Sequence, residues 1–289
     1  MIFEIRHTGN LPEIRTDAYR TLARGEFVSN TLKLHIQGTR KSYASGVKKS
    51  IEAVWNQACQ QAEADGRQLY NGKLFSLLGH QMGHGALNLL LGETDYKELV
   101  GTNLSLWEVG KGAAAVDHAD GLAVSSTLLT SDGFLLIGRR SAKVYDGRGK
   151  LHVCGGHPDP EHALSAEEIV TNENPLFRAM EKEIREEFHI TAGQISHIRG
   201  LGLIRSSGSG KPEMIFTTAL KITSAKALAL QASAKDKEEH QEIYLIPAKR
   251  GALLDYLENH HRELTVPALG ALIFFGESRG FWREVQGQS

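Results

Sequence analysis

The stretch "MEKEIREEFHI", residues 180–190, holds four glutamates among seven consecutive positions. In a helix, Glu183, Glu186 and Glu187 stand at i, i+3 and i+4, so their side chains converge on one face. Glu181 lies roughly 160° around the axis from Glu183, at about 100° per residue, and does not join them. Neighbouring carboxylates repel one another, and a divalent cation removes that repulsion because Mg²⁺ prefers hard oxygen ligands. The spacing alone leaves open a simpler alternative, an acidic face covered by solvent.

A helix over residues 175–188 must position these carboxylates. Asn174 suits the N-cap position and Pro175 suits the first helical position. Apolar residues then recur at i, i+3, i+7 and i+11 and form one stripe that should face a core. They are Phe177, Met180, Ile184 and Phe188. The sequence therefore predicts one well-defined amphipathic helix that carries the carboxylates.

Strands and turns are predicted around this helix. Residues 122–141 should form a hairpin, because two apolar runs are joined by a Ser-Asp-Gly turn at 131–133. Two more strand pairs are predicted, one within 142–156 and one across the loop at 207–211, with a further strand at 242–248. Helices are predicted over 253–264 and 266–278, the second with Pro267 in its first turn. The charged segment 234–242 is typical of an exposed loop.

Residues 1 to about 105 show a different pattern. Helical periodicity runs through the segment that begins at residue 45, and Gly66 suits its end. A buried strand is predicted at 73–83, followed by mixed apolar structure up to residue 103. The small, Gly-rich stretch 110–121 is typical of a connection. For a chain of 289 residues we therefore expect an N-terminal domain at 1–110 and a second domain at 111–289, both of α/β class.

Composition narrows the class of protein. The net charge is −1, from 33 basic and 34 acidic side chains, which gives no general attraction to nucleic acid or to an anionic membrane. Only two cysteines occur, Cys59 and Cys154, and free thiols suit a reducing cytoplasm. The charged N-terminus lacks the apolar core of a signal peptide, and no run of about 18 apolar residues occurs. We therefore expect a soluble cytoplasmic protein, with no nucleic-acid, membrane or protein partner evident.

The carboxylate helix and the glycine pair upstream of it resemble the box of the Nudix hydrolases, G-x5-E-x7-R-E-U-x-E-E-x-G-U, in which U is a bulky aliphatic residue. Gly156 matches the first glycine, and five residues of "KEIREEFHI" match in register: Glu183, Ile184, Glu186, Glu187 and Ile190. Lys182 replaces the arginine, which keeps the charge but loses its planar fork. His189 replaces the glycine after the helix, where a left-handed residue is wanted and histidine is tolerated.

The first glutamate of the box has no secure counterpart, because about 12 extra residues separate Gly156 from the helix. Counting back from the helix reaches Asn174, and counting forward from Gly156 reaches His162. Four glutamates are only neighbours of these positions: Glu161, Glu167, Glu168 and Glu173.

Three features are similar to the Nudix branch that hydrolyses UDP-glucose and UDP-galactose: the segment "VCGGHPDPEH", the insertion and the upstream "LGETDYKELVGTN". The resemblance implies an α/β/α sandwich around a mixed sheet, an N-terminal extension, and hydrolysis of a UDP-sugar to UMP and sugar 1-phosphate. It also implies Mg²⁺, with Mn²⁺ as an alternative, held by Glu183, Glu186, Glu187 and the carbonyl group of Gly155. Glu187 and Glu183 would be catalytic. Substrate contacts are expected at Arg139, Arg140, Gly156, Thr102 and Asn103.

Other readings of the sequence stay open. One alternative is that the enzyme acts on another nucleoside diphosphate derivative, such as ADP-ribose. Another is that the chain is a nucleotide-binding module that lost turnover. Instead of contacting phosphate, the paired arginines Arg139 and Arg140 could simply be a solvated strand end. Instead of contacting substrate, "DYKELVGTN" could be a turn that docks the N-terminal part on the sheet. The general base would come from outside the box, at Glu238, Glu239 or Glu242. The loop "SSGSGKPE" is no Walker A motif, because Pro212 replaces the required Ser or Thr.

Overall fold

The computed structural model describes residues 1–7, 9, 11–105, 118–141, 144–161 and 174–285. Its centre is an eight-stranded sheet in the order β13-β8-β7-β12-β11-β3, with β10 paired to β7 and β9 to β8. The pair β7–β12 is parallel and the others are antiparallel, so the sheet is mixed. The strands are β3 (Tyr19–Phe27), β7 (Ala123–Leu129), β8 (Phe134–Arg140), β9 (Leu151–His152), β10 (Cys154–Gly156), β11 (Ile195–Ser206), β12 (Pro212–Leu220) and β13 (His240–Pro247).

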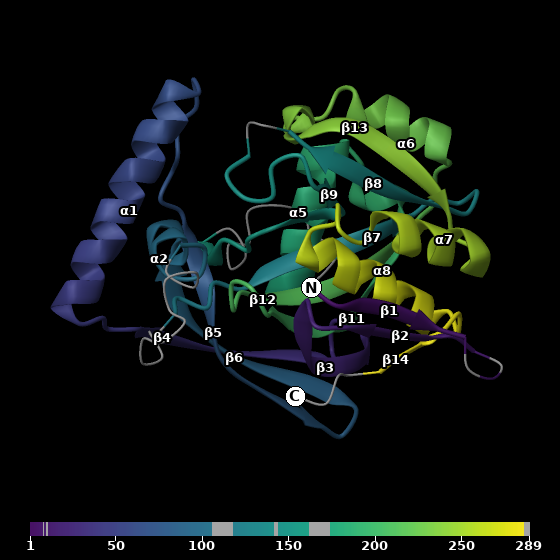
Figure 1. The fold of residues 1–289 in the computed structure, drawn as a ribbon, viewed down its shortest axis with the longest axis horizontal. Helices are drawn as coiled ribbons and strands as arrows, with labels where there is room; N and C mark the ends of the chain where they lie inside the picture. The colour runs from purple at the N-terminus through teal and green to yellow at the C-terminus, as the bar shows by residue number, and fades with distance from the viewer. Residues whose placement is uncertain (8, 10, 106–117, 142–143, 162–173, 286–289) are drawn as a thin grey trace.

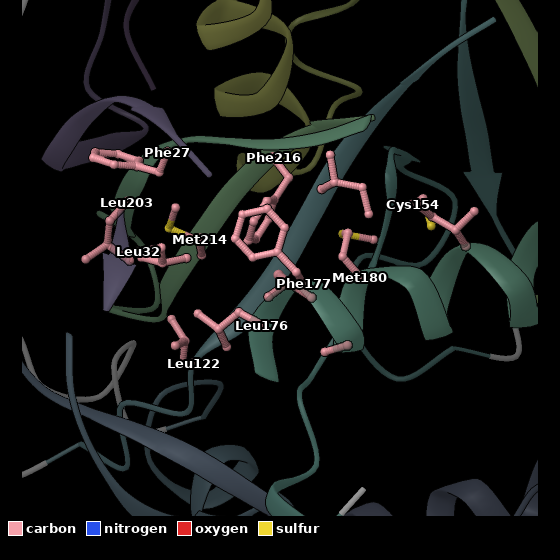
Figure 2. Close-up of a cluster of buried hydrophobic side chains, with 14 of the residues drawn as sticks. Phe27, Leu32, Leu122, Cys154, Leu176, Phe177, Met180, Leu203, Met214 and Phe216 are labelled. Atoms are coloured by element: carbon pink, nitrogen blue, oxygen red, sulfur yellow. The ribbon is translucent and has the colours of Figure 1, made fainter. Parts of the chain in front are cut away.

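Helices cover both faces of this sheet. The apolar helix α8 (Val266–Ser278) lies in front of the central strands and packs on β7, β11 and β12, with α7 (Arg250–His260) beside it (Figure 1). On the other face α5 (Pro175–Phe188) packs on β7 and β10, and α6 (Ser224–Gln231) contacts α5. Phe177 of α5 meets Phe216 of β12 edge to face, with ring centroids 5.1 Å apart, inside the apolar cluster of Figure 2. The expected α/β/α sandwich is confirmed.

Helix α5 begins and ends as its sequence predicts. The side chain of Asn174 accepts a hydrogen bond from the Leu176 N–H at 3.0 Å, and Pro175 follows at the first position. After Phe188 the chain turns left-handed at His189, with φ 55° and ψ 27°, and its N–H donates to the Arg185 carbonyl at 2.9 Å. The four stripe residues are all buried. The helix therefore has a fixed rotation, in which Glu187 is buried and Glu183 and Glu186 are partly exposed.

The N-terminal part forms elements of its own and also completes the central sheet. One small sheet joins β1 (Phe3–Arg6), β2 (Glu13–Thr16) and β14 (Arg283–Glu284). Another joins β4 (Leu32–Arg40), β6 (Ala86–Asp95) and β5 (Lys73–Gly83), with α1 (Ser45–Ala64) and α2 (Tyr96–Gly101) beside it at the left of Figure 1. Strand β3 pairs with β11. The division at residue 110 stays a prediction, since it falls in 106–117, outside the described residues.

Most predicted elements are present, but the prediction of a strand pair within 142–156 is wrong. Residues 144–149 form bends and turns, with φ of 66° at Gly147 and 70° at Gly149. The short strands β9 and β10 follow, and they pair with β8 and β7 rather than with each other. Both cysteines are free. No helix in the described residues has the length and apolar character needed to cross a membrane.

Candidate active site

A cavity of about 680 Å³ opens where the N-terminal part, the glycine pair and α5 meet. Glu183, Gly155 and Gly156 line it, together with Tyr96 from α2 and Lys211, which directly precedes β12. The segment before β13, including the 3-10 turn η2 (Lys237–Glu239), closes another side. Other lining residues include Arg140, Tyr145, His152, His157, Glu213, Lys235, Asp236, Glu238 and Glu239.

Glu183 faces this cavity beside Gly156. A Cβ atom at Gly156 would lie 2.5 Å from Cδ of Glu183, so only glycine leaves room for the carboxylate here. Burial, reinforced by the Glu187 carboxylate, raises the pKa of Glu183 to about 8. The structure thus brings together Glu183 and Gly156, two residues that the sequence analysis placed in the site.

Glu187 is buried directly behind Glu183. Its Oε1 accepts a hydrogen bond from the Gly155 N–H at 3.0 Å, and its Oε2 lies 2.7 Å from Nε2 of His240. Gly155 is itself held in the sheet by its pairing with Ser125 of β7. These contacts fasten the last turn of α5 to β10, which explains why the glutamate pair and the glycine pair occupy one place.

Glu186 lies outside this arrangement. Its carboxylate is 2.6 Å from Nζ of Lys235 and 3.8 Å from Nζ of Lys182, and it does not line the cavity. Of the three possible bases outside the box, Glu238 and Glu239 line the cavity. Burial, and then the Glu187 carboxylate, raises the pKa of Glu239. Glu242 instead accepts a hydrogen bond from the Tyr244 hydroxyl and lies outside the lining.

The two arginines at the end of β8 point in opposite directions. Arg140 lines the cavity, and its Nε donates to the Asp146 carbonyl at 3.0 Å. Arg139 binds Glu263 at 3.0 Å and the Gly149 carbonyl at 2.9 Å, away from the lining. Successive side chains of a strand alternate between its faces. Only one of the pair can therefore reach a ligand in the cavity.

Thr102 and Asn103 are buried behind the cavity wall and do not line it. The Thr102 hydroxyl donates to the Glu98 carbonyl at 2.6 Å and accepts the Ala119 N–H at 3.0 Å. The Asn103 side chain accepts the Asp120 N–H and donates to the Ser209 carbonyl, both at 3.0 Å. These hydrogen bonds connect the end of α2 to residues 119–120, which precede β7, and to the loop before β12. Direct substrate contact by either residue stays untested.

We expect Asn103→Ala to lower stability rather than to alter substrate choice. The change would leave the Asp120 N–H without its partner, and Asp120 holds a left-handed φ of 49°. An unpaired buried group costs roughly 1–3 kcal/mol. Denaturant unfolding should show this loss, while catalytic efficiencies for UDP-glucose and ADP-ribose fall by equal factors. A selective loss for one substrate would contradict the scaffold role and support direct contact.

Several cavity residues escaped the sequence analysis. Tyr96 makes edge-to-face contacts with Tyr145 and His157, at centroid distances of 6.4 and 6.2 Å. Nε2 of His157 is buried and has no hydrogen-bond partner among the described residues, and burial holds the pKa of this histidine well below its usual value. Nζ of Lys211 lies 3.4 Å from Oε2 of the buried Glu213. Two of them lie in segments that the sequence analysis quoted, His157 directly after the glycine pair and Tyr96 within "LGETDYKELVGTN".

The sequence of this chain is similar to those of several known proteins over most of its length. No family model matches it. The human uridine diphosphate glucose pyrophosphatase NUDT22 is 30% identical over 213 residues, which cover 67% of this chain and 69% of that protein. The chain belongs to the Nudix hydrolase family. It is an enzyme that hydrolyses an acid anhydride.

Other relatives extend the likeness. The NUDT22 protein of Bos taurus, which has the same name, is 27% identical over 259 residues, covering 81% of this chain and 87% of that protein. Nudix hydrolase 9 of Arabidopsis thaliana is 28% identical over 228 residues, covering 70% and 72%. Among solved structures, a C. elegans Ap4A hydrolase complex is 18% identical with a TM-score of 0.35, covering 55% of this chain and 97% of that one.

Nudix hydrolases generally use divalent metals, and the donors at this site fit such an ion. Within the described residues no three His, Cys, Asp or Glu side chains are gathered as ligands of one ion. Mg²⁺, however, is commonly bound by one or two carboxylates and completed by water and substrate phosphates. Burial, and then the neighbouring Glu187 carboxylate, raises the pKa of Glu183, so a positive ion between the two carboxylates would stabilise their charged forms.

Proposed function

We propose that this Nudix hydrolase cleaves the diphosphate of a UDP-sugar, such as UDP-glucose or UDP-galactose, to give UMP and sugar 1-phosphate. The observation that carries the proposal is that one cavity of about 680 Å³ combines carboxylate, basic and aromatic side chains. Its volume suits a small ligand. The human and bovine relatives are uridine diphosphate glucose pyrophosphatases by name, which favours a UDP-sugar over other nucleoside diphosphate derivatives.

Each group in the cavity has a chemical task in this proposal. Arg140 and Lys211 supply positive charge for the phosphate oxygens. Tyr96 and Tyr145 offer aromatic faces and hydroxyl groups to the base or the sugar. Discrimination among nucleotides depends on such groups, because a buried polar group left unpaired by the wrong substrate makes the choice steep.

Glu183, Glu187 and the carbonyl oxygen of Gly155 would hold Mg²⁺ or Mn²⁺, with Glu186 joining if it leaves Lys235. The bound ion would neutralise the phosphate oxygens, orient the attacking water and lower its pKa. Water then bonds to phosphorus, the bridging P–O bond breaks, and a carboxylate accepts the proton of the water. Glu239 lines the cavity whereas Glu187 does not, so Glu239 is the better placed base.

The substrate assignment is tested by the ratio of catalytic efficiencies for UDP-glucose and ADP-ribose at saturating Mg²⁺. We expect UDP-glucose to be preferred by at least about tenfold, the effect of roughly 1.4 kcal/mol in the transition state. A preference for ADP-ribose would support the second enzyme reading. No turnover of either compound, with both still bound, would support a nucleotide-binding module.

Arg140→Ala and Arg139→Ala form a matched pair of variants. The first removes a charge from the cavity, so we expect the catalytic efficiency for UDP-glucose to fall roughly 10- to 100-fold, as charged hydrogen bonds of about 1.5–3 kcal/mol imply. The second breaks contacts with Glu263 and Gly149 outside the lining and should change the efficiency less than about threefold. Equal losses in steady-state assays would contradict the assignment of Arg140 to the phosphates.

A further inference from the structure

His240 makes the closest contact to the carboxylate of Glu187. It is the first residue of β13, far along the chain from α5, and its side chain is buried. Nε2 lies 2.7 Å from Oε2 of Glu187, and Nδ1 is buried with no hydrogen-bond partner in the described residues. The charged segment around His240 gave no sign of this buried position.

The fold reserves space for this imidazole. A Cβ atom at Gly138 of β8 would overlap the ring at Nδ1, so glycine at this position leaves the space that the His240 ring occupies. The register of β13 against β8 shifts between His240 and Glu242, which is a β-bulge that can re-aim a side chain. Phe188, the last residue of α5, covers the ring at a centroid distance of 5.7 Å. Three separate elements therefore fix the position of His240.

The contacts of the two ring nitrogens select one tautomer. A carboxylate needs a donor, and a proton on Nδ1 would be buried without an acceptor. The tautomer that satisfies both nitrogens carries its proton on Nε2 and donates it to Oε2 of Glu187. The other oxygen, Oε1, accepts the Gly155 N–H. Gly155 and His240 each donate to one oxygen, and the buried Cys154 thiol also bonds to this carboxylate, so the carboxylate cannot rotate.

We propose that His240 is a positioning residue that holds the Glu187 carboxylate ready for the divalent cation. The inference rests on the proposed function in one respect, the role of Glu187 as a metal ligand. Partners of ligating carboxylates typically change metal affinity or activity 10- to 100-fold when they are removed. A purely structural histidine would instead change stability and leave metal affinity as it is.

The test measures Mn²⁺ binding to the full chain without nucleotide, by electron paramagnetic resonance of free Mn²⁺. We expect His240→Phe, which removes the donor, to weaken binding at least about tenfold. His240→Gln keeps an amide donor and should stay within about threefold of the unchanged protein. Gly138→Ala keeps the imidazole but displaces it, so it should resemble His240→Phe. Gln241→Ala, at an exposed neighbour, is the control.

Unchanged Mn²⁺ affinity in folded His240→Phe and Gly138→Ala would overturn the proposal, and so would equal losses in the Gln and Phe variants. If His240→Phe does not fold, His240→Gln and Gly138→Ala decide the question by the same criteria. No Mn²⁺ binding by the unchanged protein also overturns it. A protein that binds Mn²⁺ but hydrolyses no UDP-sugar contradicts the proposed function only, because the variants are still compared by metal affinity.

Discussion

Removal of divalent cations should abolish UDP-glucose hydrolysis by this chain, and added Mg²⁺ should restore it. Glu183 lines the cavity that must accept a diphosphate and Glu187 lies next to it, so without a cation these two groups offer the phosphate oxygens no positive partner. A metal ion contributes several kcal/mol to such a reaction, which corresponds to a loss of roughly 10³-fold or more. The measurement is the initial rate in EDTA, followed by titration with Mg²⁺ and Mn²⁺.

A control separates metal-dependent chemistry from metal-dependent folding. The unfolding temperature in EDTA should stay close to that of the untreated protein, because the sandwich has two apolar cores and does not need an ion to fold. A full rate of hydrolysis in EDTA, after metal analysis shows that no ion remains, would contradict the proposed mechanism.

Glu187→Gln should lower turnover of UDP-glucose on the order of 10²-fold or more while the chain stays folded. Glutamine keeps the shape of the side chain and an acceptor for the Gly155 N–H, but it removes the negative charge. The loss is therefore expected in metal binding or in catalysis by the carboxylate. Turnover and its dependence on Mg²⁺ concentration are measured together with the far-ultraviolet circular dichroism spectrum.

Two variants on the same helix make this comparison sharper. Glu181→Gln removes an equal charge from another side of α5 and should leave turnover within about threefold of the unchanged protein. Glu186→Gln breaks the contact with Lys235 and tests whether this third glutamate joins the ion. Near-normal turnover of the Glu187→Gln variant at saturating Mg²⁺ would remove Glu187 from the site.

Helix α5 could be predicted because all of its signals are local. Asn174 and Pro175 begin it, one apolar stripe sets its rotation, and His189 ends it, so no distant residue had to be known. Strands β1, β2 and β3 were missed for the opposite reason. Strand β3 pairs with β11 and β2 pairs with β14, both across large separations in the sequence. Their own residues carry little of that information.

The site was predictable to a similar extent. The convergence of Glu183 and Glu187 follows from helix spacing, but the capture of Glu186 by Lys235 depends on a segment about fifty residues away. Strand alternation alone indicates that Arg139 and Arg140 diverge, a consequence the sequence analysis did not draw. His240 could not be assigned, because its burial depends on Gly138 and on a bulge that appear only in the folded sheet.

The products formed from UDP-glucose test the central claim most directly. The full chain is incubated with UDP-glucose and Mg²⁺, and the phosphorus-containing products are identified by ³¹P nuclear magnetic resonance. The account predicts UMP and glucose 1-phosphate in equal amounts, formed with Mg²⁺ and absent in EDTA. Formation of UDP and free glucose, or intact UDP-glucose under conditions in which the chain hydrolyses ADP-ribose, would contradict it.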